Sequence, residues 1–588
     1  MSEVPRARID PDRNKGWVRR LLPLLRAHSA LLTTSLVAAL LSQLLLVAAP
    51  RVVMAAIDTA LVRQARPLGI FVVALLVLAV ARLAVDIVYR ATLFKTSACL
   101  EYDLRALLQD HLGRQSFSWY DGTQTGSLIS RANSDVRAIE RFLVFTPAVV
   151  ITFVGFAFAL VLMAQIHVGL TLAAMGVLPL VYLGGIRMQR IMWPVSWLVQ
   201  ARTADVATVV EENLAGAHVV RAMAAERPQI DKLDRSAERL RWIATEEVAI
   251  RARYQPLIDN VPRMASAVVL IYGGLLAVDG EITLGALVAF TAYVALMQAP
   301  FRLLGFIVMM AQRASASAAR VFEVLDAEPE IVDAPHAVPL RAPRGEVVFD
   351  DVTFGYADGP DVLRGFDLTL RPGETVALVG RTASGKSTVG RLVPRFYEVR
   401  TGRMTVDGHD VRDLTLHSLR SHVGVLADEP FLFSASVRDN IAYGRPDATD
   451  AEVRSAAQTA CALEFVEQLP QGFDTVIGER GYTLSGGQRQ RIAIARTLLA
   501  NPRVLVLDDA TSAVDVEVER QIHQALEQTL AGRTTLVIAH RLSTIALADR
   551  VALLQDGRVV ATGSHAELLR TVPAYAQVLA HVEQEQPA

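Results

Sequence analysis

Two adjacent carboxylates, Asp508 and Asp509, follow the apolar run VLVL and begin a short polar turn. A carboxylate at the end of a buried strand can hold the coordination shell of Mg²⁺, and a second one beside it can take a proton from an attacking water. The alternative is that both acids only cap the helix that follows. A phosphate-binding loop elsewhere in the chain would favour the first interpretation.

Such a loop occurs as G-x-x-x-x-G-K-S at residues 380–387, after the apolar run ETVALV and before a helical segment. This position between a strand and a helix is the context in which the spacing cradles phosphates. Lys386 is expected to reach the β- and γ-phosphates, and the hydroxyl of Ser387 to ligate Mg²⁺ together with Asp508. Backbone N–H groups and the helix N-terminus are expected to complete the site. Its nucleotide-binding residues are Gly380, Thr382, Ala383, Ser384, Gly385, Lys386, Ser387 and Thr388.

A second glycine-containing turn, LSGGQRQR at residues 484–491, opens another helix. Its N-terminal residues expose N–H groups at a positive helix end, which is a second anion site. Alone this is a modest signal, because SGG also begins ordinary helices. The residues concerned are Ser485, Gly486, Gly487 and Gln488.

The rest of the chain must supply the elements that position these groups. Of its 588 residues 52% are hydrophobic, and residues 29–50, 143–164 and 168–186 contain no Asp, Glu, Lys or Arg. Runs of about 20 such residues can span a bilayer as helices. Several of them in one half of the chain favour a membrane protein over buried core helices.

We expect six spans, each only partly in lipid, because a helix of about 40 residues is roughly twice as long as the hydrocarbon core is thick. Polar stretches such as 101–114 and 200–253 are expected to extend these helices into water. By hydrophobic pattern the spans are 29 to about 60, 67 to about 110, about 130–164, about 167–213, about 228–278 and about 282–325.

The basic N-terminal segment, residues 1–28, is expected on the inner side of the membrane. The first apolar run is too long for the core of a signal peptide, so we interpret it as a retained span. An even number of spans then places both termini in the cytoplasm, in a multi-pass protein of the cytoplasmic (inner) membrane that contacts the lipid bilayer. A net charge of −1 does not point to nucleic acid as a partner.

The pattern changes after the spans. Residues 326–345 contain four prolines and are expected to form an extended linker. From Glu346 onward, short β-rich runs alternate with helical segments, which predicts an α/β domain with a largely parallel sheet. The expected fold is thus a membrane α-helical domain of six long helices (29–325) followed by an α/β P-loop ATPase domain (346–588).

These motifs together resemble the ATP-binding cassette half-transporters with the exporter fold, in which six spans precede one nucleotide-binding domain. The resemblance covers nearly the whole chain and rests on GRTASGKST, LSGGQ, VLVLDDATSAVD and VIAHRLST. It implies ATP and Mg²⁺ as cofactors. It also implies that two chains pair head to tail, with each ATP between the phosphate loop of one chain and the LSGGQ of the other.

The resemblance assigns roles to further residues. It implies that Tyr356 stacks on adenine, that His540 contacts the γ-phosphate, and that Asp515 belongs to a loop crossing the dimer interface. Segments near 117–127 and 211–222 resemble the two internal coupling segments that dock on the ATPase domains.

The chain departs from the family pattern at two carboxylates. The catalytic base after the magnesium aspartate is glutamate in the family but Asp509 here, and Asp428 stands where a glutamine is expected. Removing one CH₂ withdraws the base by about an ångström, a displacement that can cost roughly 10²-fold in rate. Asp428 can still ligate Mg²⁺ but offers no amide N–H.

A weakened base beside an intact LSGGQ favours one half of a heterodimer. The LSGGQ would complete the partner half-transporter's competent site, while this chain's own site mainly holds ATP and hydrolyses it slowly. A homodimer with two slow sites is the alternative.

Four arginines on four different spans lie about 22–32 Å from the outer helix ends at 1.5 Å per residue. They could form a cationic vestibule for amphipathic anions. Snorkelling to the inner interface, with helical Arg82–Asp86 and Asp259–Arg263 pairs, is the interpretation we favour. The four candidates are Arg82, Arg187, Arg263 and Arg302.

The sequence therefore predicts an ATP-driven transporter subunit that moves an amphipathic substrate, such as a lipid, a drug-like compound, a peptide or a siderophore-like molecule. A regulatory membrane subunit with little turnover, or an importer that uses the exporter fold, remain alternatives. A soluble cassette ATPase of the DNA-repair or translation type is disfavoured by the uncharged spans.

Overall fold

The computed structural model describes residues 8–176, 178–428, 430–478, 481, 483–508, 530, 532–539 and 541–584. It divides into two compact units. A helical unit comprises Met1–Gly113 and Gly126–Ala327, and a C-terminal unit comprises Arg114–Thr125 and Glu328–Ala588. Residues 114–125 thus make their contacts mainly with the C-terminal unit, although they lie between two long helices in sequence.

The helical unit contains six helical passes within the described residues, and the expected fold class is confirmed. Three passes are long and apolar enough to cross a membrane, namely Ser29–Val62, Leu68–Leu112 and Thr125–Ile166. α4 alone has 45 residues, or about 68 Å, so it is far longer than a hydrocarbon core. The passes are α3 (Ser29–Ala55) with η1 (Ala56–Val62); α4 (Leu68–Leu112); α6 (Thr125–Ser130), η2 (Arg131–Asp135) and α7 (Val136–Ile166); α8 (Val168–Met175) and α9 (Leu178–Ala215); α11 (Glu226–Val278); and α12 (Leu284–Leu296) with α13 (Gln298–Leu325).

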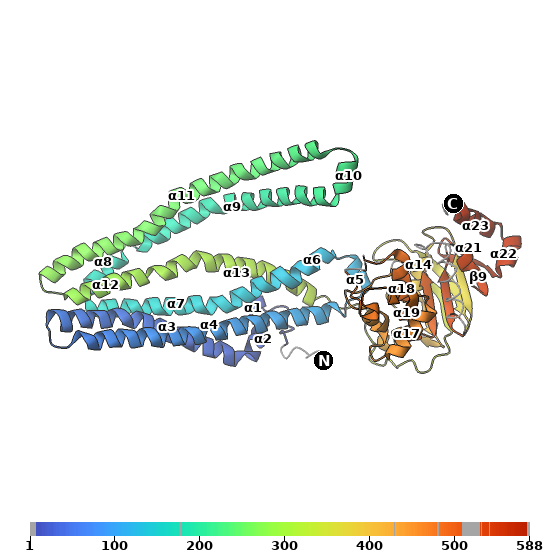
Figure 1. Ribbon diagram of the computed structural model, residues 1–588, viewed down its shortest axis with the longest axis horizontal. Helices are drawn as coiled ribbons and strands as arrows, with labels where there is room; N and C mark the ends of the chain where they lie inside the picture. The colour runs from blue at the N-terminus through green and yellow to red at the C-terminus, as the bar shows by residue number, and fades with distance from the viewer. Residues whose placement is uncertain are drawn as a thin grey trace. The chain divides into compact units, whose positions relative to one another are not determined.

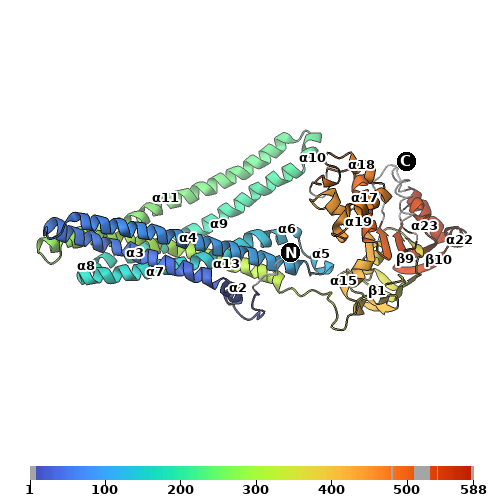
Figure 2. The same ribbon diagram turned by 60° about the horizontal axis from the view of Figure 1, so that its bottom comes forward.

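Within this unit α3, α4, α7 and α13 run side by side (Figure 1). α9 and α11 form a hairpin closed by the short α10 (Ala217–Ala222), and the α10 end of the hairpin lies apart from the other helices of the helical unit in both views (Figures 1 and 2). α10 falls in the segment near 211–222 that the resemblance marks as a coupling segment.

The N-terminal segment is clamped to the end of α13. It forms the short helices α1 (Trp17–Arg20) and α2 (Leu22–Ala27). The guanidinium of Arg20 donates two hydrogen bonds to the carboxylate of Asp326, at 2.7 and 2.6 Å, and lies 4.0 Å from the ring centroid of Phe322. Arg20 is buried, and its hydrogen bond lowers the pKa of Asp326. A bidentate, charge-assisted pair of this kind fixes orientation as well as position.

The C-terminal unit contains a six-stranded sheet in the order β10-β9-β3-β8-β7-β6. All its strand pairs are parallel except β9 with β10, which confirms the largely parallel sheet. All five residues of β3 and of β8 are buried, as expected for parallel strands covered on both faces. The strands are β3 (Thr375–Val379), β6 (Val423–Leu426), β7 (Val504–Asp508), β8 (Thr534–Ile538), β9 (Arg550–Gln555) and β10 (Arg558–Gly563).

A second, antiparallel sheet of four strands has the order β2-β1-β4-β5 and was not anticipated from the sequence. Its strands are β1 (Val347–Phe354), β2 (Leu363–Leu370), β4 (Thr401–Val406) and β5 (His409–Asp410). The helices of this unit within the described residues are α5 (Phe117–Asp121), α14 (Lys386–Leu392), α15 (Leu416–His422), α16 (Val437–Ile441), α17 (Asp450–Thr459), α18 (Leu463–Glu467), α19 (Gly486–Ala500), α21 (Leu542–Ile545), α22 (His565–Thr571) and α23 (Pro573–Gln584). Of these, α17, α18 and α19 lie together, and α22 lies beside β9 and β10 (Figure 2).

The strand order places the expected site at one edge of the parallel sheet. β3 leads into the phosphate loop, and β7, separated from it only by β8, ends at Asp508. Carboxyl ends of parallel strands meet at the same edge, where α/β folds bind their ligands.

Candidate functional site

The phosphate loop connects β3 to α14, and two of its glycines are required by geometry. Gly385 is the N-cap of α14 with φ of +104°, a conformation that side chains disfavour. A Cβ on Gly380 would lie 2.4 Å from the carbonyl oxygen of Leu554. The loop therefore passes so close to β9 that a residue without a side chain is required at Gly380.

Lys386 is buried at the start of α14. Its ammonium donates to the carbonyl oxygens of Gly380 and Arg381, at 2.8 and 3.1 Å, so it lies across the loop. The hydroxyl oxygen of Ser384 is buried without a hydrogen-bond partner among the described residues. A cation and a buried polar group thus face the same short loop, as a triphosphate site needs.

Ser387 and Asp508 bring two hard oxygen donors together. The hydroxyl of Ser387 donates to the Oδ1 of Asp508 over 3.3 Å, across the 121 positions that separate them in sequence. Mg²⁺ is typically bound by one or two protein oxygens together with substrate phosphates and waters. This hydroxyl–carboxylate pair fits that ion, and no cluster of three or more His, Cys, Asp or Glu side chains competes for it within the described residues.

Tyr356 lies just after β1 and is held by its neighbours. Its ring meets Phe354 and Tyr397 edge to face, with centroids 5.0 and 5.2 Å away. Its hydroxyl is 3.1 Å from the Oγ1 of Thr388 on α14. Tyr356, which is expected to stack on adenine, is thus hydrogen-bonded to α14, the helix whose N-terminus is expected to bind the phosphates.

Ser485 begins α19 as the N-cap of a capping box. Its hydroxyl accepts from the N–H of Gln488 over 3.3 Å, and the Gln488 side chain accepts from the N–H of Ser485 over 2.9 Å. Ser485 is exposed, while Gly487 is buried. The helix therefore presents a rigid N-terminus with an accessible serine at the surface of the unit, with Gly486 between them.

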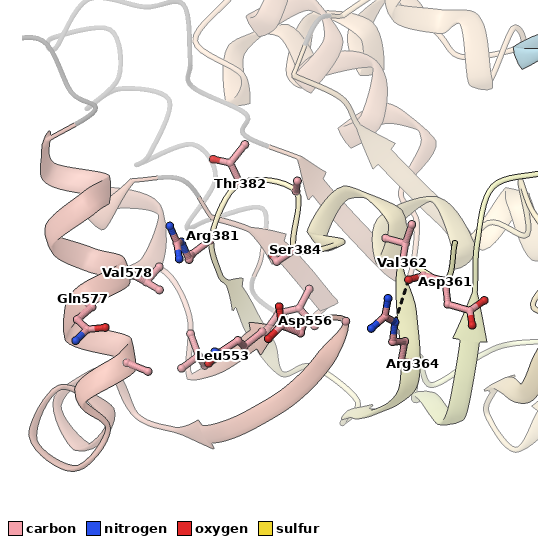
Figure 3. Close-up of a pocket in the computed structure, with 15 residues that line it drawn as sticks. Asp361, Val362, Arg364, Arg381, Thr382, Ser384, Leu553, Asp556, Gln577 and Val578 are labelled. Atoms are coloured by element: carbon pink, nitrogen blue, oxygen red, sulfur yellow. Dashed lines mark hydrogen bonds between the residues drawn. The ribbon is translucent and has the colours of Figure 1, made fainter. Parts of the chain in front are cut away.

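A cavity of about 650 Å³ borders the tip of the phosphate loop. Figure 3 shows Thr382 and Ser384 on the loop, Asp556 after β9, and Gln577 and Val578 on α23 around it. Two arginines, Arg364 and Arg381, share its wall with Asp361 and Asp556, so the wall is of mixed charge. Lys386 and Ser387 do not line it.

Three expected site residues, Asp509, Asp515 and His540, lie outside the described residues. Asp428 is described and exposed, just beyond β6. Because β6 neighbours β7 in the sheet, Asp428 follows a strand that ends at the same edge as Asp508.

The predicted arginines of the helical unit do not form one cluster among the described side chains. The Nε of Arg82 lies 3.8 Å from Asp86, as predicted, and Asp86 also accepts from the hydroxyl of Ser42. Arg263 donates to Asn260 over 3.1 Å. Arg187 is exposed on α9, whereas the side chains of Arg302 and of Asp259, the expected partner of Arg263, lie outside the described residues.

The resemblance implies that the segment near 117–127 docks on the ATPase domain, but sequence reasoning missed the partners of α5, which lie in the region after α14. The hydroxyl of Tyr397 donates to Asp121 over 2.9 Å, and Phe117 packs on Phe396 with ring centroids 4.5 Å apart. Burial and this carboxylate raise the pKa of Tyr397 to about 12. The aromatic pair Phe396–Tyr397 stands out in the sequence only as two adjacent rings, and nothing local links it to residue 121.

Two family models match the chain. Residues 32–301 match the ABC transporter transmembrane region, and residues 363–512 match the ABC transporter model that covers the ATP-binding part. The second match lies within the C-terminal unit, and the first lies in the helical unit except for residues 114–125.

Several curated relatives match along most of their length, and two of them illustrate the similarity. The chain is 37% identical over 489 residues to an ATP-dependent lipid A-core flippase of Desulfotalea psychrophila, covering 83% of this chain and 85% of the relative. It is 36% identical over 487 residues to a putative multidrug export ATP-binding/permease protein of Bacillus subtilis, covering 81% and 82%. A solved structure of a bacterial Atm1-family ABC exporter with ATP bound aligns with a TM-score of 0.78 at 27% identity, over 96% of this chain and 99% of the other.

Proposed function

This chain belongs to the ABC transporters that join a transmembrane region to an ATP-binding domain, as a half-transporter with the exporter fold, and from that premise we propose how its residues work. ATP hydrolysis is coupled to transport in this family. The proposal concerns the groups that bind ATP, the partner chain and the class of substrate.

We assign the triphosphate to the loop from Gly380 to Thr388, and the observation that carries this is the convergence of Lys386, Ser387 and Asp508 at one sheet edge. Lys386 neutralises the β- and γ-phosphates, and α14 directs its N-terminal N–H groups at them. Ser387 and Asp508 would hold Mg²⁺, which would supply positive charge to offset that of the phosphates. The half-buried ring of Tyr356 would support the adenine base.

The direct test is ATPase activity of the full-length chain in lipid nanodiscs, alone and with its partner. We expect ATP turnover that depends on Mg²⁺ and is lost on chelation with EDTA. Turnover that persists with EDTA would contradict the assignment of Ser387 and Asp508.

We propose that this chain is the weaker half of a heterodimer. Two sequence features support this, Asp509 in place of glutamate and Asp428 in place of glutamine. A third is the intact capping box that presents Ser485 and Gly486 at the start of α19. The catalytic base of this chain, Asp509, has a shorter side chain than glutamate. The LSGGQ groups that this chain would offer to a partner's ATP, by contrast, are complete.

A regulatory subunit that binds ATP with little turnover is a second candidate, favoured by the same two aspartates. Turnover of the purified chain without a partner separates the two roles. A regulatory subunit would not raise the ATPase rate of the assembled transporter through its own LSGGQ.

The protein is proposed to lie in the cytoplasmic membrane with both termini inside, because the first span follows a basic segment and the helical passes are even in number. We further propose an amphipathic substrate, in line with the named activities of the relatives. Arg251 and Arg263 line a recess of about 530 Å³ on α11, which offers positive charge to an acidic amphiphile.

Replacing Arg263 or Arg302 with alanine is expected to reduce transport of acidic amphiphiles about tenfold, since the loss of one charged hydrogen-bonding group costs about 1.5–3 kcal/mol. Transport of cationic dyes should change less than about twofold. Uptake into inverted vesicles of a fluorescent acidic lipid analogue and of a cationic dye measures both. The matched control is Arg241→Ala. Arg241 is exposed, lies nearer the N-terminal end of α11 and pairs with Glu238. Equal losses for both substrate classes would instead support a structural role.

A further inference from the structure

We propose that Tyr397 is a positioning residue that joins the aromatic platform at Tyr356 to the segment 117–121, so that binding of a nucleotide's base, rather than of its phosphates, orders that segment. This inference rests on the proposed role of Tyr356 in ATP binding. The residues concerned all belong to the C-terminal unit.

The first contact joins the two tyrosines. The rings of Tyr356 and Tyr397 meet at 87° with centroids 5.2 Å apart, and Phe354 packs against both, at 5.0 and 5.8 Å. Edge-to-face pairs of this kind have a preferred geometry. A base that stacks on Tyr356 would fix the tilt of that ring and thereby restrict Tyr397, which is 7% exposed and has little room to move.

The second contact joins Tyr397 to α5. Its hydroxyl donates to Oδ2 of Asp121 over 2.9 Å, a charge-assisted bond that is stronger than a neutral one. Asp121 is exposed and is the last residue of α5. A helix of five residues is too short to be stable by itself, so its order depends on such tertiary contacts.

Other contacts hold α5 independently of the base. Phe117 packs on Phe396, and Ser118 donates to Glu330 over 2.5 Å. This ring contact and this hydrogen bond do not involve Tyr356, so they hold α5 in place whether or not a nucleotide is bound. The ring of Phe117 also approaches Tyr397, with centroids 6.3 Å apart. The Tyr397–Asp121 bond differs from the contacts to Phe396 and Glu330 because it is a directional hydrogen bond from a side chain that also touches Tyr356.

The phosphates act on a different group. The backbone of α14 and Lys386 are expected to face them, and the hydroxyl of Tyr356 lies 3.1 Å from Oγ1 of Thr388 on that helix. A nucleotide without a base would engage the loop and leave the ring face of Tyr356 uncovered. Base and phosphate binding can therefore be separated by experiment.

The test is amide hydrogen exchange of the full-length protein in nanodiscs with Mg²⁺ and either ATP or inorganic tripolyphosphate. In the wild type, ATP should slow exchange about tenfold at both 380–388 and 117–121, because opening of α5 then breaks a charged hydrogen bond held in place by the base. Tripolyphosphate should protect 380–388 but leave 117–121 within about twofold of the free protein.

Three variants sharpen the result. Tyr397→Phe keeps the ring but loses the donor, so ATP should protect 117–121 less than about threefold while protection of 380–388 and the KM for ATP stay unchanged. Asp121→Ala should behave in the same way, whereas Asp121→Asn keeps a carbonyl acceptor and should restore at least half of the protection. Tyr443→Phe, which removes the hydroxyl of an exposed tyrosine stacked on Phe433, is the matched control and should resemble the wild type.

The other outcomes would overturn either the inference or the proposed ATP site. Full protection of 117–121 in Tyr397→Phe, or equal protection by tripolyphosphate and ATP, would overturn the inference. Absence of ATP protection at 380–388 in the wild type would refute the proposed ATP site itself, and the inference with it. If Tyr397→Phe alone lost protection at 380–388, the Asp121 variants would test the inference instead, since neither changes the aromatic platform. Full protection of 117–121 in Asp121→Ala would then overturn it.

Discussion

Replacing Lys386 with alanine is expected to weaken ATP binding at this chain's site by about 10²-fold or more. Removing one partner of a buried, hydrogen-bonded charge pair costs about 2–5 kcal/mol, and the ammonium of Lys386 is buried at the loop. Its bonds to the carbonyls of Gly380 and Arg381 would be lost as well, so the loop itself would relax.

Photolabelling of this chain with 8-azido-ATP in the assembled transporter measures the effect, because the label on a partner chain can be resolved separately. Lys232→Ala is the matched control, since Lys232 is exposed on α11 and pairs with Glu212. Labelling of the Lys386→Ala chain at the wild-type level would contradict the assignment of the phosphate loop.

Ser485→Ala is expected to lower ATPase activity of the assembled transporter far more than Asp509→Asn does. In a heterodimer the signature helix of this chain completes the partner's competent site, where removal of one donor to the reacting phosphate costs about 10²–10³-fold. The base at Asp509 is already compromised, so Asp509→Asn should change turnover less than about threefold. Replacing the corresponding glutamate of the partner chain should cost about 10²–10⁴-fold.

The chain contains its own control for the serine. Ser564 caps α22 through the same capping box, with Glu567 in the place of Gln488. Loss of either cap costs about 1 kcal/mol of helix stability, but only Ser485 lies at the LSGGQ turn. Ser564→Ala should therefore leave the ATPase rate nearly unchanged. A large loss from Asp509→Asn, equal to that from Ser485→Ala, would refute the degenerate site and favour two equivalent sites.

The long helices and the phosphate loop could be predicted because their signals are local. An uncharged apolar run specifies a spanning helix without help from the rest of the chain, and the helical pass that contains α11 begins and ends within a few residues of the expected 228–278. The phosphate loop is contiguous, so strand, glycines, lysine and helix all appear in one stretch of sequence.

The missed features join residues far apart. The antiparallel sheet pairs β1 with β4, at positions 48 to 59 residues apart, and such register depends on a face that is buried only in the finished fold. The Tyr397–Asp121 bond spans 276 positions. Asp86 forms the expected pair with Arg82, but it also accepts from Ser42 on the neighbouring helix, 44 positions away.

The clamp between Arg20 and Asp326 implies an order of events during synthesis. Its two residues are 306 positions apart, so the bond cannot form until the last helical pass has left the ribosome. Domains generally fold as units, beginning from the N-terminus. The helical unit can therefore join its first and last segments before most of the C-terminal unit has been made. The entropy lost in closing so long a loop must then be offset by contacts among the membrane helices themselves.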